Sequence, residues 1–237
     1  MSIKGKLMAF TLHDISASLP PEKNRADGLW TRFVLRPLSI PVAWAALRLH
    51  FGANGVSYIS SLFSIAGGVL FSMNGFWLPL WGAILFNCFS VLDCVDGNIA
   101  RVTHTASPWG GWADAVMGFV AYTCVFISTG IYVYLRGGCW LVLVIAAVTA
   151  SANLLTRVAY QIYKNIVGEE AHGSVSFERK LAENVGITGF LMPALIVCHF
   201  TGGMIFIVAF NLLFYLGGCL ATIIKLARKI SIQSANK

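Results

Sequence analysis

Three carboxylates stand close together in a part of the chain that is otherwise strongly apolar. Asp93, Asp96 and Asp114 lie in the stretch VLDCVDGNIARVTHTASPWGGWADAVMG, residues 91–118. On a helix, Asp93 and Asp96 share one face, and Asp114 follows about one turn into a second, antiparallel helix. Carboxylate oxygens are the ligands that Mg²⁺ and Mn²⁺ prefer, with positions left for water and phosphate. The spacing therefore predicts a divalent-metal site that can bind a phosphate-bearing substrate.

The composition of the whole chain places these acids in a membrane. Of the 237 residues, 57% are hydrophobic and 11% are charged, and the mean hydropathy is +0.73. These values favour an all-α integral membrane protein over a soluble domain. A charge at the centre of a membrane helix costs roughly 2.5–3.5 kcal/mol on insertion scales, so the three acids need compensation. The net charge of +7 is typical of loops that face an anionic leaflet, and no basic run with interleaved aromatics indicates nucleic acid.

Apolar segments of suitable length predict a six-transmembrane-helix bundle with an N-terminal interfacial amphipathic helix. The expected parts are a polar, poorly ordered tail (1–27), an interfacial helix (28–53), the membrane domain (54–230) and a C-terminal tail (231–237). Pro37 and Pro41 are expected to bend the interfacial helix because proline cannot donate a backbone hydrogen bond. The predicted spans are 55–73, 76–101, 110–135, 138–163, 184–201 and 204–226.

The positive charges predict the orientation of this bundle. An even number of spans with a cytoplasmic N-terminus returns the C-terminus to the cytoplasm, and nearly all cations then face that side, with Arg157 inside the fourth span near it. Only Arg136 falls on the opposite side. We therefore expect cytoplasmic termini and location in a bacterial inner membrane. The cytoplasmic cations are Lys4, Lys6, Lys23, Arg25, Arg32, Arg36, Arg48, Arg101, Lys164, Arg179, Lys180, Lys225, Arg228, Lys229 and Lys237.

The acidic residues alone leave two other interpretations open. They can belong to a structural network of Asp and Arg side chains, or to a proton or ion relay in a small carboxylate-lined transporter. A transporter is expected to show inverted repeats or paired broken helices, and neither pattern is visible in the sequence.

At these residues the sequence resembles the CDP-alcohol phosphotransferases, also called class I CDP-alcohol phosphatidyltransferases. That family carries the pattern D-x2-D-G-x2-A-R-x8-G-x3-D-x3-D, and this chain matches seven of its eight fixed positions at the right spacing. The family's "PNxxT" at the start of the first span has a counterpart in "ANGVS", with Asn54 and Ser57. The matching motif residues are Asp93, Asp96, Gly97, Ala100, Arg101, Gly110 and Asp114.

The resemblance implies transfer of a phosphatidyl or other phosphoalcohol group from a CDP-alcohol, such as CDP-diacylglycerol, to an acceptor hydroxyl with release of CMP. It implies two divalent ions, Mg²⁺ or Mn²⁺, on Asp93, Asp96 and Asp114. The product would be a phospholipid or a related phosphodiester. Because members of the family commonly form dimers, the resemblance also implies a homodimer in the lipid bilayer. By the match, the residues expected to bind CDP are Asn54, Ser57, Asp93, Gly97, Ala100, Arg101 and Gly110.

Basic residues are the candidates for binding the acceptor. Some family members bind a phosphorylated acceptor with cations in this region, and Arg157 with Arg179 or Lys180 are the candidates here. Alternatively, Arg157 reaches the headgroups or pairs with one of the three acids.

The chain departs from the family pattern at its last position. Gly118 stands where the family has a fourth Asp, which is both a metal ligand and the proposed general base. Glycine can do neither, so the base is unknown. A water, a substrate phosphate or another side chain such as His104, His172 or Glu183 can replace it. The other interpretation is a catalytically altered or inactive member that still binds a CDP-lipid.

Overall fold

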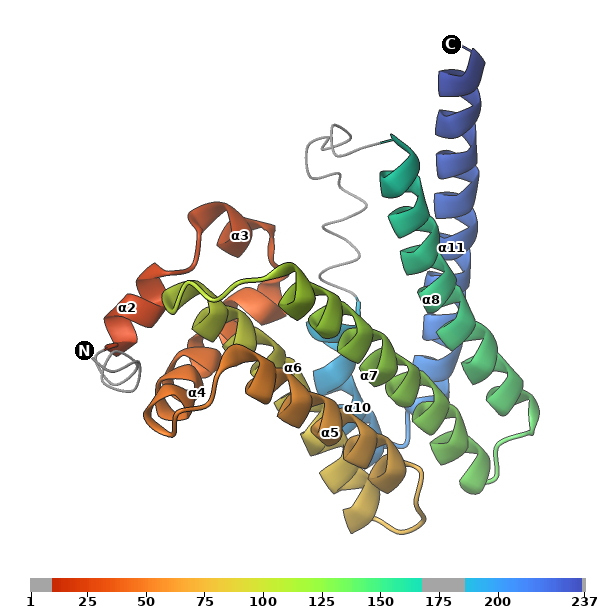
Figure 1. Ribbon diagram of the computed structural model, residues 1–237. Coiled ribbons are helices and arrows are strands. Elements are labelled where there is room, and N and C mark those ends of the chain that lie inside the picture. The colour runs from red at the N-terminus through yellow and green to blue at the C-terminus, as the bar shows by residue number, and fades with distance from the viewer. Residues whose placement is uncertain (1–9, 168–185, 236–237) are drawn as a thin grey trace.

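The computed structural model describes residues 10–167 and 186–235, and every regular element within these ranges is a helix (Figure 1). The prediction of an all-α protein is confirmed. The elements are α2 (Leu12–Ala17), α3 (Pro21–Ala26), the π-helical turn η1 (Thr31–Leu35), α4 (Arg36–Arg48), α5 (Ala53–Phe71), α6 (Trp77–Val102), α7 (Pro108–Leu135), α8 (Leu141–Val167), the π-helical turn η3 (Ile187–Leu191), α10 (Met192–Thr201) and α11 (Met204–Ala235).

Five of these helices are long and apolar enough to cross a membrane, namely α5, α6, α7, α8 and α11. They match five of the predicted spans to within a few residues at most ends. The predicted span 184–201 begins outside the described residues, and its described part forms η3 and α10, with a shorter apolar helix over Gly189–Thr201. The count of six spans therefore stays a prediction, whereas the integral membrane class is supported by the five long helices.

Residues 10–27 differ from the polar, poorly ordered tail that we expected, because they fold into α2 and α3. Thr11 and Asp14 form a reciprocal capping box: Thr11 Oγ1 accepts from the Asp14 backbone N–H, and Asp14 Oδ2 accepts from the Thr11 N–H. Ile15 is fully buried in a cluster with Leu47 of α4 and Ile99 of α6. The cap starts a helix of only six residues, and the burial of Ile15 holds it in place.

The segment expected to be a bent interfacial helix is helical from Thr31 to Arg48, with a π-helical turn before the first proline. The Arg36 N–H donates to the carbonyl of Thr31, five residues back. Pro37 and Pro41 have no N–H to donate, so the helix loses two backbone bonds here. Helix α4 packs against α6, which brings the N-terminal part of the chain to the helix that carries the motif.

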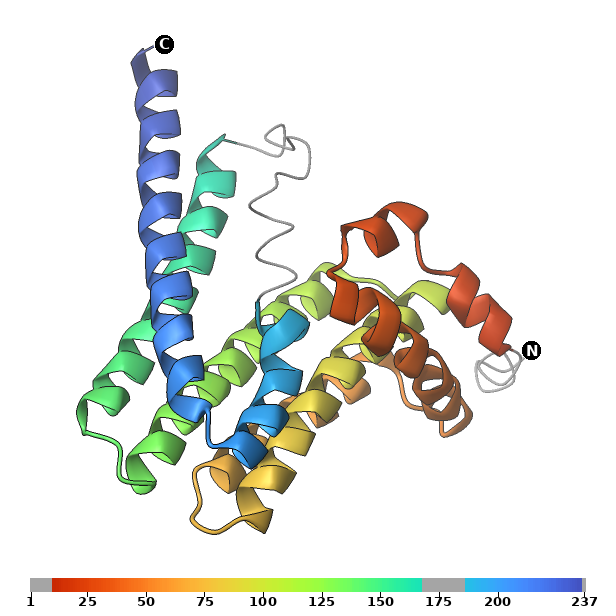
Figure 2. The ribbon, with the colours of Figure 1, turned by 180° about the vertical axis from the view of Figure 1, so that it is seen from behind.

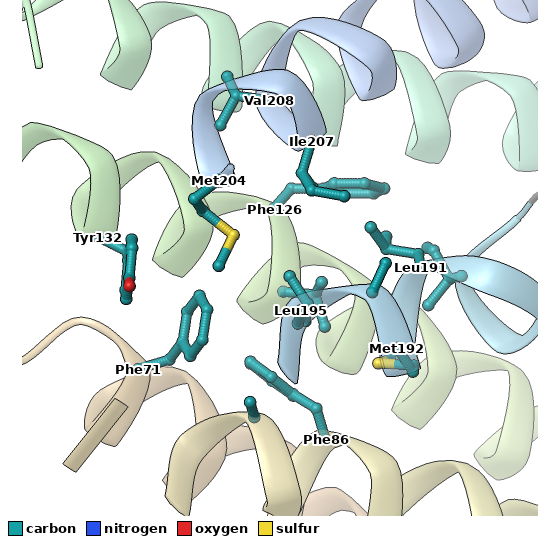
Figure 3. Packing of buried hydrophobic residues seen from close by; sticks show 14 of the residues in the cluster. Phe71, Phe86, Phe126, Tyr132, Leu191, Met192, Leu195, Met204, Ile207 and Val208 are labelled. Atoms are coloured by element: carbon teal, nitrogen blue, oxygen red, sulfur yellow. The ribbon is translucent and has the colours of Figure 1, made fainter. Parts of the chain in front are cut away.

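The main core is formed by residues of α5, α6, α7, α8, η3, α10 and the start of α11 (Figure 3). Phe71 of α5 stacks on Tyr132 of α7, with ring centroids 4.8 Å apart. An added Cβ on Gly82 would lie 2.5 Å from the Phe71 backbone N, so this glycine permits the close approach of α5 and α6. The rigid contact of these two helices fixes the position of the acids that follow on α6.

The two ends of the helix bundle differ in the elements and charged residues that lie there. Helices α2, α3 and α4 gather at the end where α6 finishes and α7 begins (Figures 1 and 2). At the opposite end Arg136 donates from Nη2 to the carbonyl of Gly75 in the turn between α5 and α6, at 2.6 Å. The lone cation predicted for the other side thus lies away from the motif.

Candidate active site

Asp96 is tied to the first turns of α5. The Ser57 hydroxyl donates to Asp96 Oδ2 at 2.6 Å, and both side chains are buried. Hydrogen bonds to an ionised acceptor are short and are stronger than neutral ones. The structure therefore brings together two residues that the sequence assigned to the site from separate motifs.

The start of α7 lies beside the start of α5. Ser107 is the N-cap of α7, and its Oγ accepts from the Gly110 N–H at 3.1 Å. A Cβ on Gly110 would lie 3.4 Å from Asn54 Oδ1 and 3.3 Å from Ser107 Oγ. A larger residue at position 110 would crowd both polar groups. The predicted residues Asn54 and Gly110 are thus neighbours in space.

Arg101 folds back along α6 over Gly97. A Cβ on Gly97 would lie 3.2 Å from Arg101 Nη1, so a side chain there would press on the guanidinium. Arg101 Nη2 donates to Asn98 Oδ1 at 2.6 Å, while its buried Nε finds no partner among the described residues. Ala100, the other small motif residue, is half-buried on the same helix. An arginine held in this way keeps donors available for a bound anion.

A chain of hydrogen bonds joins Arg101 to the N-terminal part of the protein. Asn98 donates from Nδ2 to Ser39 Oγ at 2.8 Å, and Ser39 donates to the carbonyl of Arg36 at 2.8 Å. Arg36 in turn forms an ion pair with Asp27, with 2.8 Å between Nε and Oδ2. Asn98 and Ser39 were missed by sequence reasoning. The spacing of Asn98 and Arg101, three apart on one helix, is a signal that could have indicated their contact.

Asp93 and Asp114 complete the acidic part of the site. Asp93 is half-buried and Asp114 is exposed, and neither forms a hydrogen bond or ion pair within residues 10–167 and 186–235. The charges of Asp96 and Asp114 both act on Asp93, so the three acids lie within electrostatic range of one another. The alternative of a structural Asp–Arg network has no support here, because no described arginine pairs with any of the three.

The acids do not form a closed metal site as they stand. In the described part of the chain, no three His, Cys, Asp or Glu side chains converge closely enough to hold an ion. The donor set nevertheless fits Mg²⁺ or Mn²⁺ in its chemistry, since it offers hard carboxylate oxygens and two of the three groups have no hydrogen-bond or ion-pair partner among the described residues. For such a site to close around an ion, the three carboxylate side chains would have to rotate while their helices stay in place.

Gly118 is buried one turn beyond Asp114 on α7, and the space beside it is taken by an aromatic ring. A Cβ on Gly118 would lie 3.8 Å from the Tyr122 ring, which is ordinary van der Waals contact. Arg157 of α8 stacks over that ring at 4.5 Å from its centroid and donates from Nε to Asn153 Oδ1 at 3.3 Å. Arg157 thus contacts an aromatic face and an amide, and pairs with none of the three acids.

Several predicted residues add nothing to this geometry. His104 is exposed in the turn after α6, with a backbone φ of 54°. Arg179 and Lys180, with the candidate bases His172 and Glu183, lie outside the described residues. Tyr122 was not singled out from the sequence, although its position four residues after Gly118 places it on the same helical face.

The fold and this constellation define a helical membrane protein with a three-carboxylate motif across two neighbouring helices. The chain belongs to the CDP-alcohol phosphatidyltransferase family, whose model matches residues 50–224. The resemblance inferred from the motif is therefore confirmed.

The chain is also similar to phosphatidylinositol phosphate synthases of three bacteria. It is 31% identical over 98 residues to that of Streptomyces avermitilis, covering 41% of this chain and 39% of that protein. The identity is again 31% over 98 residues for Cutibacterium acnes, covering 41% and 45%, respectively. For Mycolicibacterium smegmatis it is 31% over 99 residues, covering 41% and 43%. The matched part of the chain spans less than half the length of each of these curated relatives.

Proposed function

We propose that this protein is a membrane CDP-alcohol phosphotransferase that makes a phospholipid or a related phosphodiester. The main support for the proposal is the conformation of the motif in the structure. Asp96 accepts a hydrogen bond from Ser57, and the Arg101 side chain lies over Gly97. The family match over residues 50–224 supports the same activity. The donor substrate is CDP-diacylglycerol or another CDP-alcohol, and the acceptor is an alcohol.

The reaction is a single displacement at phosphorus. The acceptor hydroxyl oxygen attacks the β-phosphorus of the CDP-alcohol, the bond from that phosphorus to the bridging oxygen breaks, and CMP leaves with that oxygen. Asp93, Asp96 and Asp114 would hold the divalent ions. Such ions, when bound, neutralise charge on the attacking and leaving oxygens.

The remaining motif residues bind and orient the donor. Arg101 offers guanidinium donors to a phosphate, and Asn98 holds it in place. Gly97 and Ala100 leave room on the same helix for the nucleotide. Asn54 and Gly110 form the neighbouring wall where α5 and α7 begin, and Ser57 fixes one rotamer of Asp96.

The acceptor is proposed to carry a phosphate. The names of the relatives describe synthases of phosphatidylinositol phosphate, which supports a phosphorylated polyol acceptor. Arg157 is the described cation on the α8 side of the site, held against Tyr122 and Asn153. Arg179 and Lys180 remain proposed partners in binding that phosphate.

Gly118 supports a second candidate function, a relative that binds CDP-lipid without turning it over. Because glycine cannot accept a proton, the acceptor hydroxyl must lose its proton to a water, a substrate phosphate or another side chain. General bases typically contribute about 10²–10⁴-fold, so the loss of one need not abolish turnover.

The test is CMP release by the purified protein in a bilayer, with CDP-diacylglycerol, Mg²⁺ or Mn²⁺ and a panel of acceptors that includes inositol phosphate. Asp93→Asn is the matched control because it keeps the size of the side chain and removes its charge. Acceptor-dependent CMP release that Asp93→Asn abolishes supports the enzyme. Binding of CDP-diacylglycerol without CMP release for any acceptor supports the non-catalytic relative.

The proposed setting is a bacterial inner membrane with both termini in the cytoplasm, and the proposed assembly is a homodimer. The placement of Arg136 at the end opposite the motif is consistent with this orientation.

A further inference from the structure

A cavity of about 230 Å³, lined by both polar and apolar side chains, lies between the N-terminal helices and α6. Its polar lining comes from Ser16, Asn24, Arg32, Arg36 and Asn98, and none of the three motif acids borders it. At 100° per residue, Asn98 lies about 160° around α6 from Asp96. The cavity therefore opens on a different face of α6 from the acidic site.

The charges around this cavity are unbalanced toward positive. The Arg36 side chain is 10% exposed and gives its Nε to Asp27. Its two Nη groups make no hydrogen bond with any described residue. Asp27 balances one of the two lining arginines, and the other, Arg32, is exposed.

The positive charges of this region also act on Lys23 of α3. Lys23 is exposed, and its pKa is lowered from the usual value by partial desolvation and then by the positive charges of Arg101 and Arg36, which outweigh the opposing charge of Asp27. Lys23 does not line the cavity, and it also acts electrostatically on Asp93 and Asp114, so it belongs to the positive surroundings of both sites.

We propose that this cavity binds a phosphate group through Arg32 and Arg36, as an accessory site that adjoins Arg101 of the family's motif through Asn98 but is distinct from the three carboxylates. Arginine matches phosphate because its planar fork donates two parallel hydrogen bonds. The volume is below that of a drug-sized pocket, about 300–1,000 Å³, and suits a phosphate with a few attached atoms. The hydroxyl of Ser16 and the amide of Asn24 add uncharged donors to the same lining.

The surface next to the cavity favours a phosphate at the membrane boundary. Phe33, Leu38 and Val42 are exposed on η1 and α4, and the Arg32 guanidinium stacks 5.3 Å from the Phe33 ring centroid. Exposed apolar side chains beside arginines are typical of helices that lie in the membrane interface, at the depth of lipid phosphates. The headgroup of an anionic phospholipid and a free phosphate share this chemistry, and the experiment separates them.

The experiment measures the thermal midpoint, Tm, of the full chain in detergent by tryptophan fluorescence, with EDTA present so that no divalent ion bridges phosphate to the acids. The probes are inorganic phosphate, against chloride at equal ionic strength, and short-chain phosphatidylglycerol, against short-chain phosphatidylcholine. The site variants are Arg32→Gln, which removes an exposed cation, and Ser16→Phe, which fills the cavity without changing charge. Arg48→Gln is the matched control: it removes an exposed cation from the same helix, away from the cavity.

The wild type is expected to gain Tm with at least one phosphate-bearing probe. Both site variants should bind that probe about ten-fold more weakly, since a charge-assisted hydrogen bond is lost or blocked. Arg48→Gln should respond as the wild type does. A response to phosphatidylglycerol alone assigns the site to a headgroup, and a response to inorganic phosphate assigns it to free phosphate.

Three results overturn the proposal: no rise in Tm with either probe, an unchanged response in both site variants, or an equal loss in Arg48→Gln. Arg157→Gln makes the outcome independent of the proposed catalytic function. A response that persists in Arg157→Gln and vanishes in Arg32→Gln supports the accessory site, whereas the reverse pattern assigns the phosphate to the acceptor side.

Discussion

The Ser57 hydroxyl donates a 2.6 Å hydrogen bond to Asp96 Oδ2, and this contact joins the first turns of α5 to the motif on α6. Ser57 also reaches the carbonyl of Ala53 at 3.2 Å, within its own helix. The orientation of one metal-ligand candidate is thus set by a residue 39 positions earlier in the chain. A group that holds a ligand in one rotamer acts on affinity and rate without touching the substrate.

Ser57→Ala is expected to lower kcat/KM for CMP release by about ten-fold, because a hydrogen bond to a charged group contributes roughly 1.5–3 kcal/mol. Ser57→Thr keeps the hydroxyl and should stay near wild type. The measurement is the dependence of CMP release on Mg²⁺ or Mn²⁺ concentration, with Tm recorded for each variant. A Ser57→Ala protein that requires no more metal than wild type would show that this contact is structural only.

Asn98→Ala is expected to weaken donor binding, because Arg101 loses the amide that holds it over Gly97. The predicted effect is a rise of about ten-fold in KM for the CDP-alcohol with a smaller change in kcat. Ser39→Ala is the matched control. It removes the far end of the same chain of hydrogen bonds and leaves the bond from Arg101 to Asn98 in place. Equal KM values in the two variants would mean that Asn98 acts through helix packing and not through Arg101.

The helices that carry the acids were predictable because their signal is local. Long apolar runs define spans, and the three-residue spacing of Asp93 and Asp96 places both on one face of whichever helix forms. Two short motifs assigned Ser57 and Asp96 to the same site, but the hydrogen bond between them was not predicted and is seen only in the structure. In each case the residue types alone were enough to indicate a place in a membrane helix or at the substrate site.

The other features of the fold and the site could not be predicted, because they depend on contacts between residues that are far apart in the sequence and have no distinctive residue type. The bond from Asn98 to Ser39 links positions 59 apart, and neither residue stands out in a membrane helix. Likewise, α2 looked like part of a polar tail because its single core residue, Ile15, is isolated among polar neighbours in the sequence. How closely three side chains converge is decided by helix packing and rotamers, so spacing could assign the acids to one site without setting their distances.

Ile15→Ala is expected to detach α2 from α4 and α6. The side chain is fully buried, and deleting such an isoleucine costs about 2–5 kcal/mol in well-packed cores. The result should be a lower Tm in detergent and faster proteolysis within residues 10–27. Leu12→Ala is the control on the same helix, because Leu12 is 48% exposed and its loss should change Tm little. Equal effects from both variants would count against Ile15 as the anchor of this segment.

Gly118→Asp is expected to raise CMP release by about ten-fold or more, since a general base contributes typically 10²–10⁴-fold and this variant supplies the missing carboxylate of the family motif. The new Cβ would lie 3.8 Å from the Tyr122 ring, in ordinary van der Waals contact, and the carboxylate beyond it would have to pack beside that ring. Gly118→Asn controls for size without the charge and should not accelerate the reaction. The measurement is kcat over a range of pH, because an added base makes the rate rise with pH through its own titration. An unchanged rate with wild-type pH dependence would show that another group already takes the proton. A protein inactive both before and after the substitution would favour the CDP-lipid-binding relative over the enzyme.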